Sequence, residues 1–240
     1  AKGEGRYYDN RAEIERAVDA GSLSYNAQIR YKLDGRKVET TPGRVIFNSI
    51  LPEGTPYQNI CLGDKELKKL IGETINIRKN SVAVTMLDAI KDIGFKYATL
   101  FGATIGLSDM IVPVSKKEIV EHANAQQAEI MNQYRQGHIT QDERYNRVIE
   151  VWSQANEDLT NELMDSLKKD QHGFNPLFMM ADSGARGSRT QIRQLGGMRG
   201  LMAKPTGDII EFPIKSNFKE GLSILEFFIS TNGARKGLSD

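Results

Sequence analysis

The chain has 240 residues, of which 39% are hydrophobic, so it is long enough to form one large domain or two small ones around a core. Its net charge of +1 hides an uneven distribution of charge, because residues 115–172 contain seven Lys/Arg and eleven Asp/Glu, whereas residues 173–240 contain nine Lys/Arg and six Asp/Glu. A basic surface over the whole protein, as many nucleic-acid-binding proteins have, is therefore excluded. The single cysteine excludes an internal disulfide, and with three histidines it forms no metal-ligand spacing, so no metal site is predicted.

Residues 1–114 show the succession of short helices and strands that is typical of a small mixed domain. Residues 27–33 alternate between apolar and polar side chains, and Asp34-Gly35 separates them from a second short strand at 36–40. This pattern predicts a β-hairpin, because the Asp-Gly dipeptide suits a two-residue turn. Thr41 followed by Pro42 predicts the start of a helix, since proline is favoured at the first helical position. No pattern in this part points to catalysis. The predicted elements are helix 11–20, strands 27–33 and 36–40, the helix opened by Pro42, and helices 64–77 and 81–99.

Residues 115–169 predict two long antiparallel helices. Two capping boxes, Ser115–Glu118 and Thr140–Glu143, begin the helices, and Gly137 is placed to end the first. At about 1.5 Å per residue the second helix would be about 40 Å long. Polar outer faces favour a hairpin that protrudes into solvent; the alternative is that both helices pack back on the body as part of a bundle. The predicted seam consists of Ile119, Ala123, Gln126 and Ile130 on the first helix and Tyr145, Val148, Trp152, Ala155 and Leu159 on the second.

Residues 178–204 concentrate glycine and positive charge. Between Asp182 and Asp208 there is no acidic residue, so the cations lack a neighbouring counter-charge and suit an anion such as phosphate. Ser188 has the spacing to cap a helix that begins at Arg189, and the N-terminus of a helix attracts anions. The cations of this segment are Arg186, Arg189, Arg193, Arg199 and Lys204.

Two alternatives compete with the anion-site prediction. The segment can be a solvated basic loop. Its arginines, Arg189 or Arg199 before Arg186, can instead pair with acidic residues inside the fold. The acidic candidates are Asp182, Asp208 and Glu211. The chain contains neither Gly-Lys-Ser/Thr nor Gly-x-Gly-x-x-Gly, which argues against a self-contained nucleotide-hydrolysing domain.

Residues 217–240 predict a C-terminal helix. The Asn217–Glu220 spacing is another capping signal, and apolar residues between 222 and 229 recur with helical periodicity. Gly233 and Gly237 each cost a helix about 1 kcal/mol relative to alanine. One interpretation therefore ends the helix at the first of these glycines, and the other continues it through both.

Residues 178–188 and 191–204 closely resemble the β′ subunit, the largest subunit of bacterial DNA-directed RNA polymerase. The resemblance continues through residues 213–222 and 228–238, and the order of segments upstream extends it over the whole chain. It implies an α+β, mostly helical fold in four parts: a mixed funnel-like subdomain (1–114), an antiparallel coiled coil of secondary-channel rim helices (115–172), a Gly/Arg-rich phosphate-facing segment (173–215) and the N-terminal half of the bridge helix (216–240).

The resemblance also implies where nucleotides bind. In the family, the positions of Arg186 and Arg193 contact the triphosphate of the incoming nucleotide in the secondary channel, and the position of Ser188 lies in the same pocket. These arginines position phosphates and do not make the new bond. A guanosine tetraphosphate site that only some lineages have is implied at Asn146, Arg147 and Glu150.

Further implied sites lie on the hairpin and on the C-terminal helix. The coiled coil docks Gre-type transcript-cleavage factors and the DksA-type stringent-response factor. Gly233 and Gly237 would permit the bridge helix to bend, and Arg235 and Lys236 would lie near nucleic acid. The implied docking tip consists of Arg135, Gln136, Gly137, His138, Ile139 and Thr140.

The implied function is a part of DNA-directed RNA polymerase, a nucleotidyltransferase. The family's magnesium-binding motif, Asn-Ala-Asp-Phe-Asp-Gly-Asp, is not in this sequence, so no catalytic residue, metal or cofactor is assigned to it and the chain alone is expected to be inactive. Implied partners are the β, α, ω and σ subunits, nucleoside triphosphates, DNA and RNA, in the cytoplasm at the nucleoid and away from membranes. The alternative is a stand-alone coiled-coil interaction module with a structural basic segment; the missing initiator Met and the end at Asp240, partway along the bridge helix, favour an excised piece.

Overall fold

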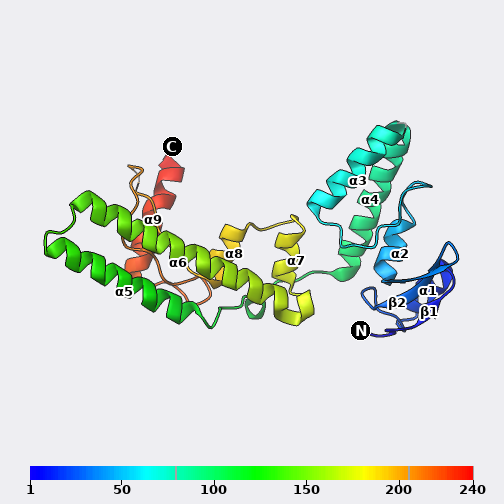
Figure 1. Ribbon diagram of the computed structural model, residues 1–240, viewed down its shortest axis with the longest axis horizontal. Coiled ribbons are helices and arrows are strands. Elements are labelled where there is room, and N and C mark those ends of the chain that lie inside the picture. The colour runs from blue at the N-terminus through cyan, green and yellow to red at the C-terminus, as the bar shows by residue number, and fades with distance from the viewer. Residues whose placement is uncertain (79, 205, 240) are drawn as a thin grey trace. The chain divides into compact units, whose positions relative to one another are not determined.

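The computed structural model describes residues 1–78, 80–204 and 206–239, and for the helical residues 232–239 it describes the backbone alone. The chain divides into two compact units, Ala1–Ala103 and Thr104–Asp240 (Figure 1). Helices dominate both units, and a small sheet lies in the first, which confirms the mostly helical α+β class. Within the described ranges, no helix is long and apolar enough to cross a membrane.

The sheet of the first unit is built around the predicted hairpin. Strand β2 (Ile29–Leu33) pairs antiparallel with β3 (Arg36–Thr40), and β1 (Tyr7–Tyr8) pairs parallel with β2. Asp34 and Gly35 both have positive φ, at 48° and 82°, which the two-residue turn requires. The hairpin is confirmed. β1 was not predicted, because two residues are too few to show a period.

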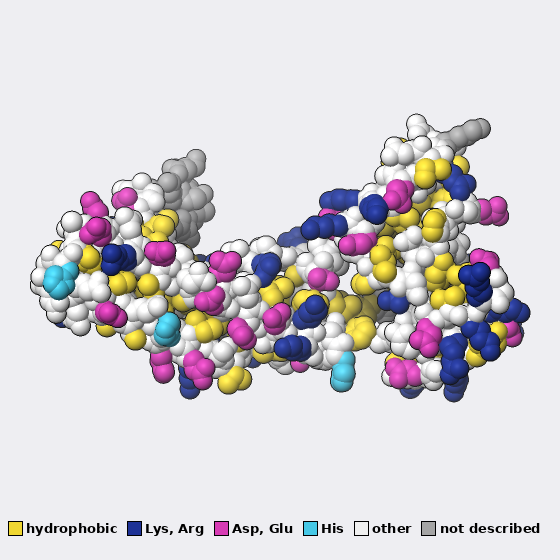
Figure 2. Space-filling view, viewed as in Figure 1, with side chains coloured by type: hydrophobic (Ala, Val, Ile, Leu, Met, Phe, Trp, Pro, Cys, Tyr) yellow, Lys and Arg dark blue, Asp and Glu magenta, His cyan; other side chains and the backbone are white. Residues whose placement is uncertain are grey.

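Four helices of the first unit match the predicted positions. They are α1 (Arg11–Asp19), α2 (Pro42–Asn48), α3 (Asp64–Ile77) and α4 (Asn80–Phe101). Ile14, Ile29 and Val45 join α1, β2 and α2 in one buried cluster. α3 and α4 pair through Leu70 and Met86, which are both buried. Other apolar side chains of this pair stay exposed, and Figure 2 shows hydrophobic side chains gathered over α3 and α4.

The second unit is built on the predicted helical hairpin, formed by α5 (Lys116–Arg135) and α6 (Gln141–Lys169). Thr140 and Glu143 form the predicted capping box at the start of α6. The box predicted at Ser115 is wrong, because Ser115 is itself helical and its hydroxyl is buried without a partner in the described part of the chain. The shorter elements of this unit are η1 (Leu107–Asp109), η2 (Asp170–Gly173), α7 (Pro176–Asp182), α8 (Arg189–Gly196) and α9 (Ile224–Ser239).

The seam between α5 and α6 agrees with the prediction at most positions. Val148, Trp152 and Leu159 are fully buried in one cluster with Ala123. Gln126 is exposed, so its place in the predicted seam is wrong. The neighbouring Gln127 faces the seam instead, where its side-chain oxygen accepts a hydrogen bond from Trp152 Nε1 at 3.0 Å. From Ala123, a step of three residues leads to Gln126 and a step of four leads to Gln127, and the seam uses the longer step.

One side of the hairpin is covered by the chain that follows α8. Arg144 donates to both oxygens of Glu211, at 2.5 and 2.8 Å. Lys215 Nζ donates to Asn124 Oδ1 at 2.7 Å and lies 5.0 Å from the centre of the Trp152 ring. The prediction that the hairpin protrudes freely is therefore wrong on this side, where the alternative of packing against the body describes the fold.

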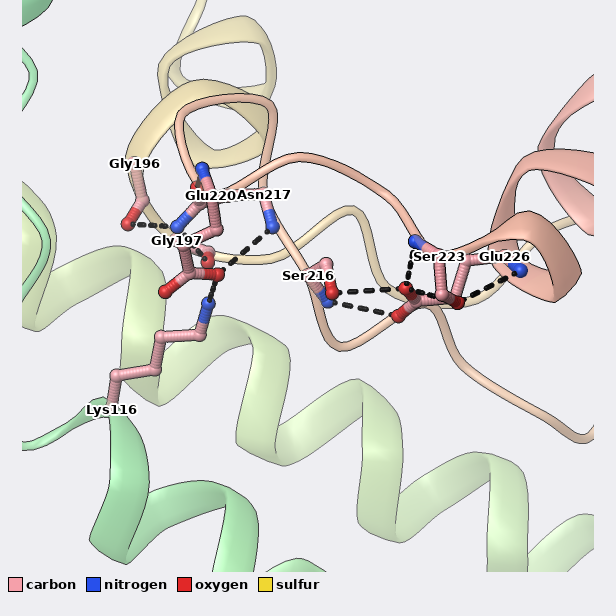
Figure 3. Close-up of polar contacts among 8 residues, drawn as sticks. All are labelled: Lys116, Gly196, Gly197, Ser216, Asn217, Glu220, Ser223 and Glu226. Carbon is pink, nitrogen blue, oxygen red and sulfur yellow. Dashed lines mark hydrogen bonds and ion pairs between the residues drawn. The ribbon is translucent and has the colours of Figure 1, made fainter.

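The beginning of α9 also differs from the prediction. Asn217 and Glu220 exchange the expected hydrogen bonds, but these close a turn and do not start a helix. α9 begins later, after Ser223, which exchanges hydrogen bonds with Glu226 (Figure 3). Two successive segments thus carry capping spacings, and only the second leads into regular helix.

Candidate functional site

The predicted anion site begins with the turn that precedes α8. Ser188 caps the helix: its Oγ accepts from Gln191 N at 3.2 Å, and Gln191 Oε1 accepts from Ser188 N at 2.9 Å. Gly184 and Gly187 have φ of 72° and 90°, which L side chains rarely adopt. Arg186 lies exposed between them, and within the described residues its side chain has no hydrogen bond or ion pair. It is therefore available to an anion from solvent.

Arg193 lies one helical turn beyond Arg189, on the side of α8 that faces α6. Its guanidinium is partly buried, and this burial lowers its pKa. Nε is buried without a hydrogen-bond partner in the described part of the structure. A cation that has lost water and gained no acceptor is poorly stabilised by its own chain, so a bound anion would compensate it.

A pocket of about 360 Å³ lies between α6 and α8. Arg189 reaches over it and donates from Nη2 to Asn161 Oδ1 at 2.9 Å. The pocket therefore brings Arg189 and Arg193 together, whereas neither Arg186 nor Ser188 belongs to its lining. The sequence includes Arg189 among the cations that suit an anion, four residues from Arg193, whereas the phosphate contacts that the resemblance implies leave it out. The lining consists of Arg189 and Arg193 with Ser153, Asn156, Glu157, Thr160 and Asn161.

Arg199, another cation of the segment, has a structural place. Its guanidinium donates to Gln194 Oε1 at 3.3 Å and to Ser230 Oγ, and lies 4.8 Å from the centre of the Phe218 ring. Glu211, one of the three acidic candidates, forms an ion pair with Arg144. Among the residues that the structure describes, no arginine of this segment pairs with the three acidic candidates, so that alternative is wrong here.

Of the three hairpin positions that the resemblance implies for a guanosine tetraphosphate site, two line the same pocket. Arg147 donates to Gln133 Oε1 at 3.2 Å, and with Glu150 it lines a shallow pocket of about 390 Å³ between α5 and α6. Asn146 is exposed and lies outside this lining. At the tip, Arg135 to Thr140 are exposed except for the half-buried Ile139, and Gly137 has φ of 79°.

At the marked positions in α9 the structure describes the backbone alone. The helical backbone runs through Gly233 and Gly237 to Ser239, so the interpretation that ends the helix at the first glycine is wrong. The side chains of Arg235 and Lys236 are outside the part that the structure describes.

A polar network that the sequence analysis missed connects the ends of α5, α8 and the loop before α9 (Figure 3). Asn217 is fully buried and donates from Nδ2 to the carbonyl oxygens of Gly196 and Gly197, at 3.0 and 3.1 Å. Lys116 Nζ lies 2.5 Å from Glu220 Oε2. The Asn217–Glu220 spacing is the sequence signal for this network, although by itself it predicts a helix start. In the described residues, no group of three or more His, Cys, Asp or Glu side chains could hold a metal ion.

Comparison with known proteins gives two family matches and a set of close relatives. The family model described as RNA polymerase Rpb1, domain 3, matches residues 4–110, and the one described as RNA polymerase Rpb1, domain 4, matches residues 139–222. The chain is 59% identical over 238 residues to the DNA-directed RNA polymerase subunit beta′ of Borrelia hermsii, and 54% identical to that of Treponema pallidum. These alignments cover 99% and 98% of this chain, which spans about 17% of the length of each relative.

Proposed function

The chain belongs to the family of bacterial DNA-directed RNA polymerase β′ subunits, and from this premise we propose that it lines the route by which nucleoside triphosphates reach the polymerase active site. In this proposal the assembled enzyme copies DNA into RNA by nucleotidyl transfer. The magnesium ions of that reaction are held by carboxylates outside this sequence, so the chain contributes binding and positioning and makes no bond itself. The enzyme works in the cytoplasm, at the nucleoid.

The observation that carries the proposal is the state of the arginines around α8. Arg186 is exposed and Arg193 is half-buried, and within the described residues neither has an acidic partner. Arginine presents paired donors that match phosphate oxygens, and such contacts position a triphosphate for transfer. Ser188, which caps α8, would lie beside the same phosphates. The alternative of a stand-alone interaction module loses support, because the relatives carry this sequence inside a much longer chain.

The hairpin has a separate role in the proposal. Its exposed tip, residues 135–140, docks Gre-type cleavage factors and the DksA-type factor at the mouth of the channel. Arg147 and Glu150 line the pocket in which guanosine tetraphosphate would bind together with the second factor; Arg147 supplies the phosphate contact, and Asn146 contributes from outside the lining. The β, α, ω and σ subunits surround this region in the assembled enzyme, and α9 lies beside DNA and RNA.

The experiment is a double substitution, Arg186→Ala with Arg193→Ala, in the assembled polymerase. Losing two charge-assisted phosphate contacts should raise the nucleotide concentration for half-maximal elongation on the order of tenfold or more. Lys168→Ala, which removes an exposed cation from the last turn of α6, serves as the matched control and should leave that concentration unchanged. An unchanged requirement in the double variant would refute the phosphate role.

A further inference from the structure

We infer that the pocket between α6 and α8 is a binding site for a phosphate-bearing anion, in which Arg189 is the second cation beside Arg193. The inference rests on the proposed function for the phosphate role of Arg193. The proposed function joins Arg193 to Arg186 in the turn before α8. The inference instead joins Arg193 to Arg189, which lies on α8 itself.

The first step is the position of Arg193. Its side chain lines the pocket and is half-buried. No hydrogen bond of its side chain is made to the described residues, and Nε is buried. An anion in the pocket would supply the acceptor that the chain does not.

The second step is the orientation of Arg189. Its guanidinium uses one nitrogen, Nη2, to bond Asn161 on α6, which holds the group over the pocket and leaves its other donors free. Arg189 and Arg193 are four residues apart on one helix, so both point to the same side. Two guanidinium groups at this spacing are suited to two neighbouring phosphate oxygens or to adjacent phosphates.

The third step is the wall formed by α6. The side chain of Asn156 lines the pocket and makes no hydrogen bond to the described residues. Its buried Oδ1 is an acceptor and cannot bind an anion, but its NH₂ group can donate to a phosphate oxygen, which adds a neutral donor to the two cations. The hydroxyl of Thr160 is already used, because it donates to the Asn156 carbonyl oxygen at 2.5 Å. Glu157 is exposed at the rim and is the one carboxylate of the lining, so two cations face one anion and the pocket stays positive.

The test measures arginine reactivity in the assembled polymerase that contains the complete β′ subunit. Phenylglyoxal modification of each arginine is quantified by mass spectrometry while inorganic tripolyphosphate is titrated at constant ionic strength. Arg189 and Arg193 should become protected with the same half-maximal concentration, while Arg135 at the tip stays reactive. A nucleoside triphosphate titrated in parallel distinguishes the ligand source: equal half-maximal concentrations would assign binding to the phosphates, and a lower one would add a contact to the nucleoside.

Two variants separate ligand binding from a structural role. Asn156→Asp keeps the shape of the side chain but places a carboxylate beside Arg193, so the half-maximal concentration should rise at least about tenfold while thermal stability is kept or increased. Arg189→Ala should raise the half-maximal concentration for protection of Arg193 by about tenfold. Lys168→Ala should change neither the half-maximal concentration for protection nor the thermal stability.

Two outcomes would overturn the inference. Protection of Arg193 together with Arg186, while Arg189 stays reactive, would move the anion to the preceding turn and leave the proposed function intact. No protection of any arginine would refute the pocket as an anion site; the proposed function would then be judged separately, by the nucleotide requirement of the Arg186 and Arg193 double variant.

Discussion

At the scale of single residues, Glu226 shows how a carboxylate can be held by neutral donors. Ser216 and Ser223 each donate a backbone N–H and a hydroxyl to it, at distances between 2.8 and 3.2 Å. Partial burial raises the pKa of Glu226, but the bonds from Ser223 and Ser216 outweigh it and lower the pKa to about 2. The carboxylate therefore joins the loop after α8 to the first turn of α9 (Figure 3).

This pKa predicts a pH dependence for the start of α9. Because the pKa is lower in the folded chain than its ordinary value of 4.5, the ionised carboxylate stabilises the fold above about pH 4.5. The contribution is lost as the pH falls from there toward about 2. Amide hydrogen exchange of residues 224–228, corrected for its intrinsic pH dependence, should be faster in Glu226→Gln than in the unaltered chain at pH 6, and the difference should shrink toward pH 3.

Glu162→Gln is the matched control for this prediction, since Glu162 is exposed on α6 and has no hydrogen bond to the described residues. It should leave the exchange of residues 224–228 unchanged at every pH. Equal exchange in Glu226→Gln and the unaltered chain at pH 6 would mean that the four hydrogen bonds contribute nothing to the order of α9.

At the scale of elements, α8 is placed by how closely its last residues approach their neighbours. A Cβ at Gly196 would lie 2.4 Å from the carbonyl oxygen of Ile111 and 3.3 Å from Leu163 Cδ1. A backbone oxygen cannot yield as a flexible side chain does, so only glycine fits without a shift of α8. Asn217 bonds the carbonyl oxygen of the same residue, which fixes this end of the helix from the other side.

Gly196→Ala should therefore destabilise the second unit, by about 1–3 kcal/mol, because α8 must move away from its neighbours. Trp152 is the only tryptophan of the chain and is buried in one cluster with Met198, which follows α8, so its fluorescence follows the unfolding of this unit in urea. The midpoint of that transition should fall. Gly72→Ala is the control: it lies in α3 with open space around it and should leave the Trp152 transition unchanged while stabilising α3 by about 0.5–1 kcal/mol. An unchanged midpoint in Gly196→Ala would show that α8 is not held by close packing.

The elements themselves were largely predictable, and their partners were not. Caps and periodicity located α1, α3 and α6 to within a residue or two, because those signals are local. The same signals failed at Ser115 and Asn217, where the tertiary structure uses the residues differently. The pocket brings Arg193 together with Arg189 and with polar side chains of α6 that lie 32 to 40 residues earlier, an arrangement that no local spacing encodes. The phosphate role of Arg186 and Arg193 stays a prediction.

At the scale of the whole molecule, the second unit combines an exposed tip with a hairpin whose other end is fixed. The segment after α8 covers the hairpin from Arg144 to Trp152. In the proposed docking, a factor would therefore reach only the tip and the uncovered side. Figure 2 shows Asp and Glu side chains along the hairpin, interspersed with hydrophobic side chains and some Lys and Arg, and residues 115–172 hold eleven Asp/Glu against seven Lys/Arg. This arrangement favours docking by a surface rich in cations.

Substitutions at the tip should separate factor action from basal elongation in the assembled enzyme. Arg135→Ala with His138→Ala removes two exposed side chains and leaves the Gly137 turn intact, so the fold of the hairpin should be kept. The concentration of cleavage factor for half-maximal transcript cleavage should rise about tenfold, while elongation without the factor stays unchanged. Equal loss of both activities would instead indicate a structural role for the tip.

The contact between Lys116 and Glu220 has a consequence for how this sequence can change during evolution. The two residues are separated by 104 positions in the chain, and the Lys116 side chain is only 11% exposed. Loss of the Glu220 carboxylate would leave a nearly buried ammonium group without its counter-ion, which is usually more harmful than losing both charges together. The substitutions that Lys116 tolerates therefore depend on the residue at position 220, and the reverse is also true. Among related sequences we expect the two positions to change together, either by exchange of both charges or by loss of both.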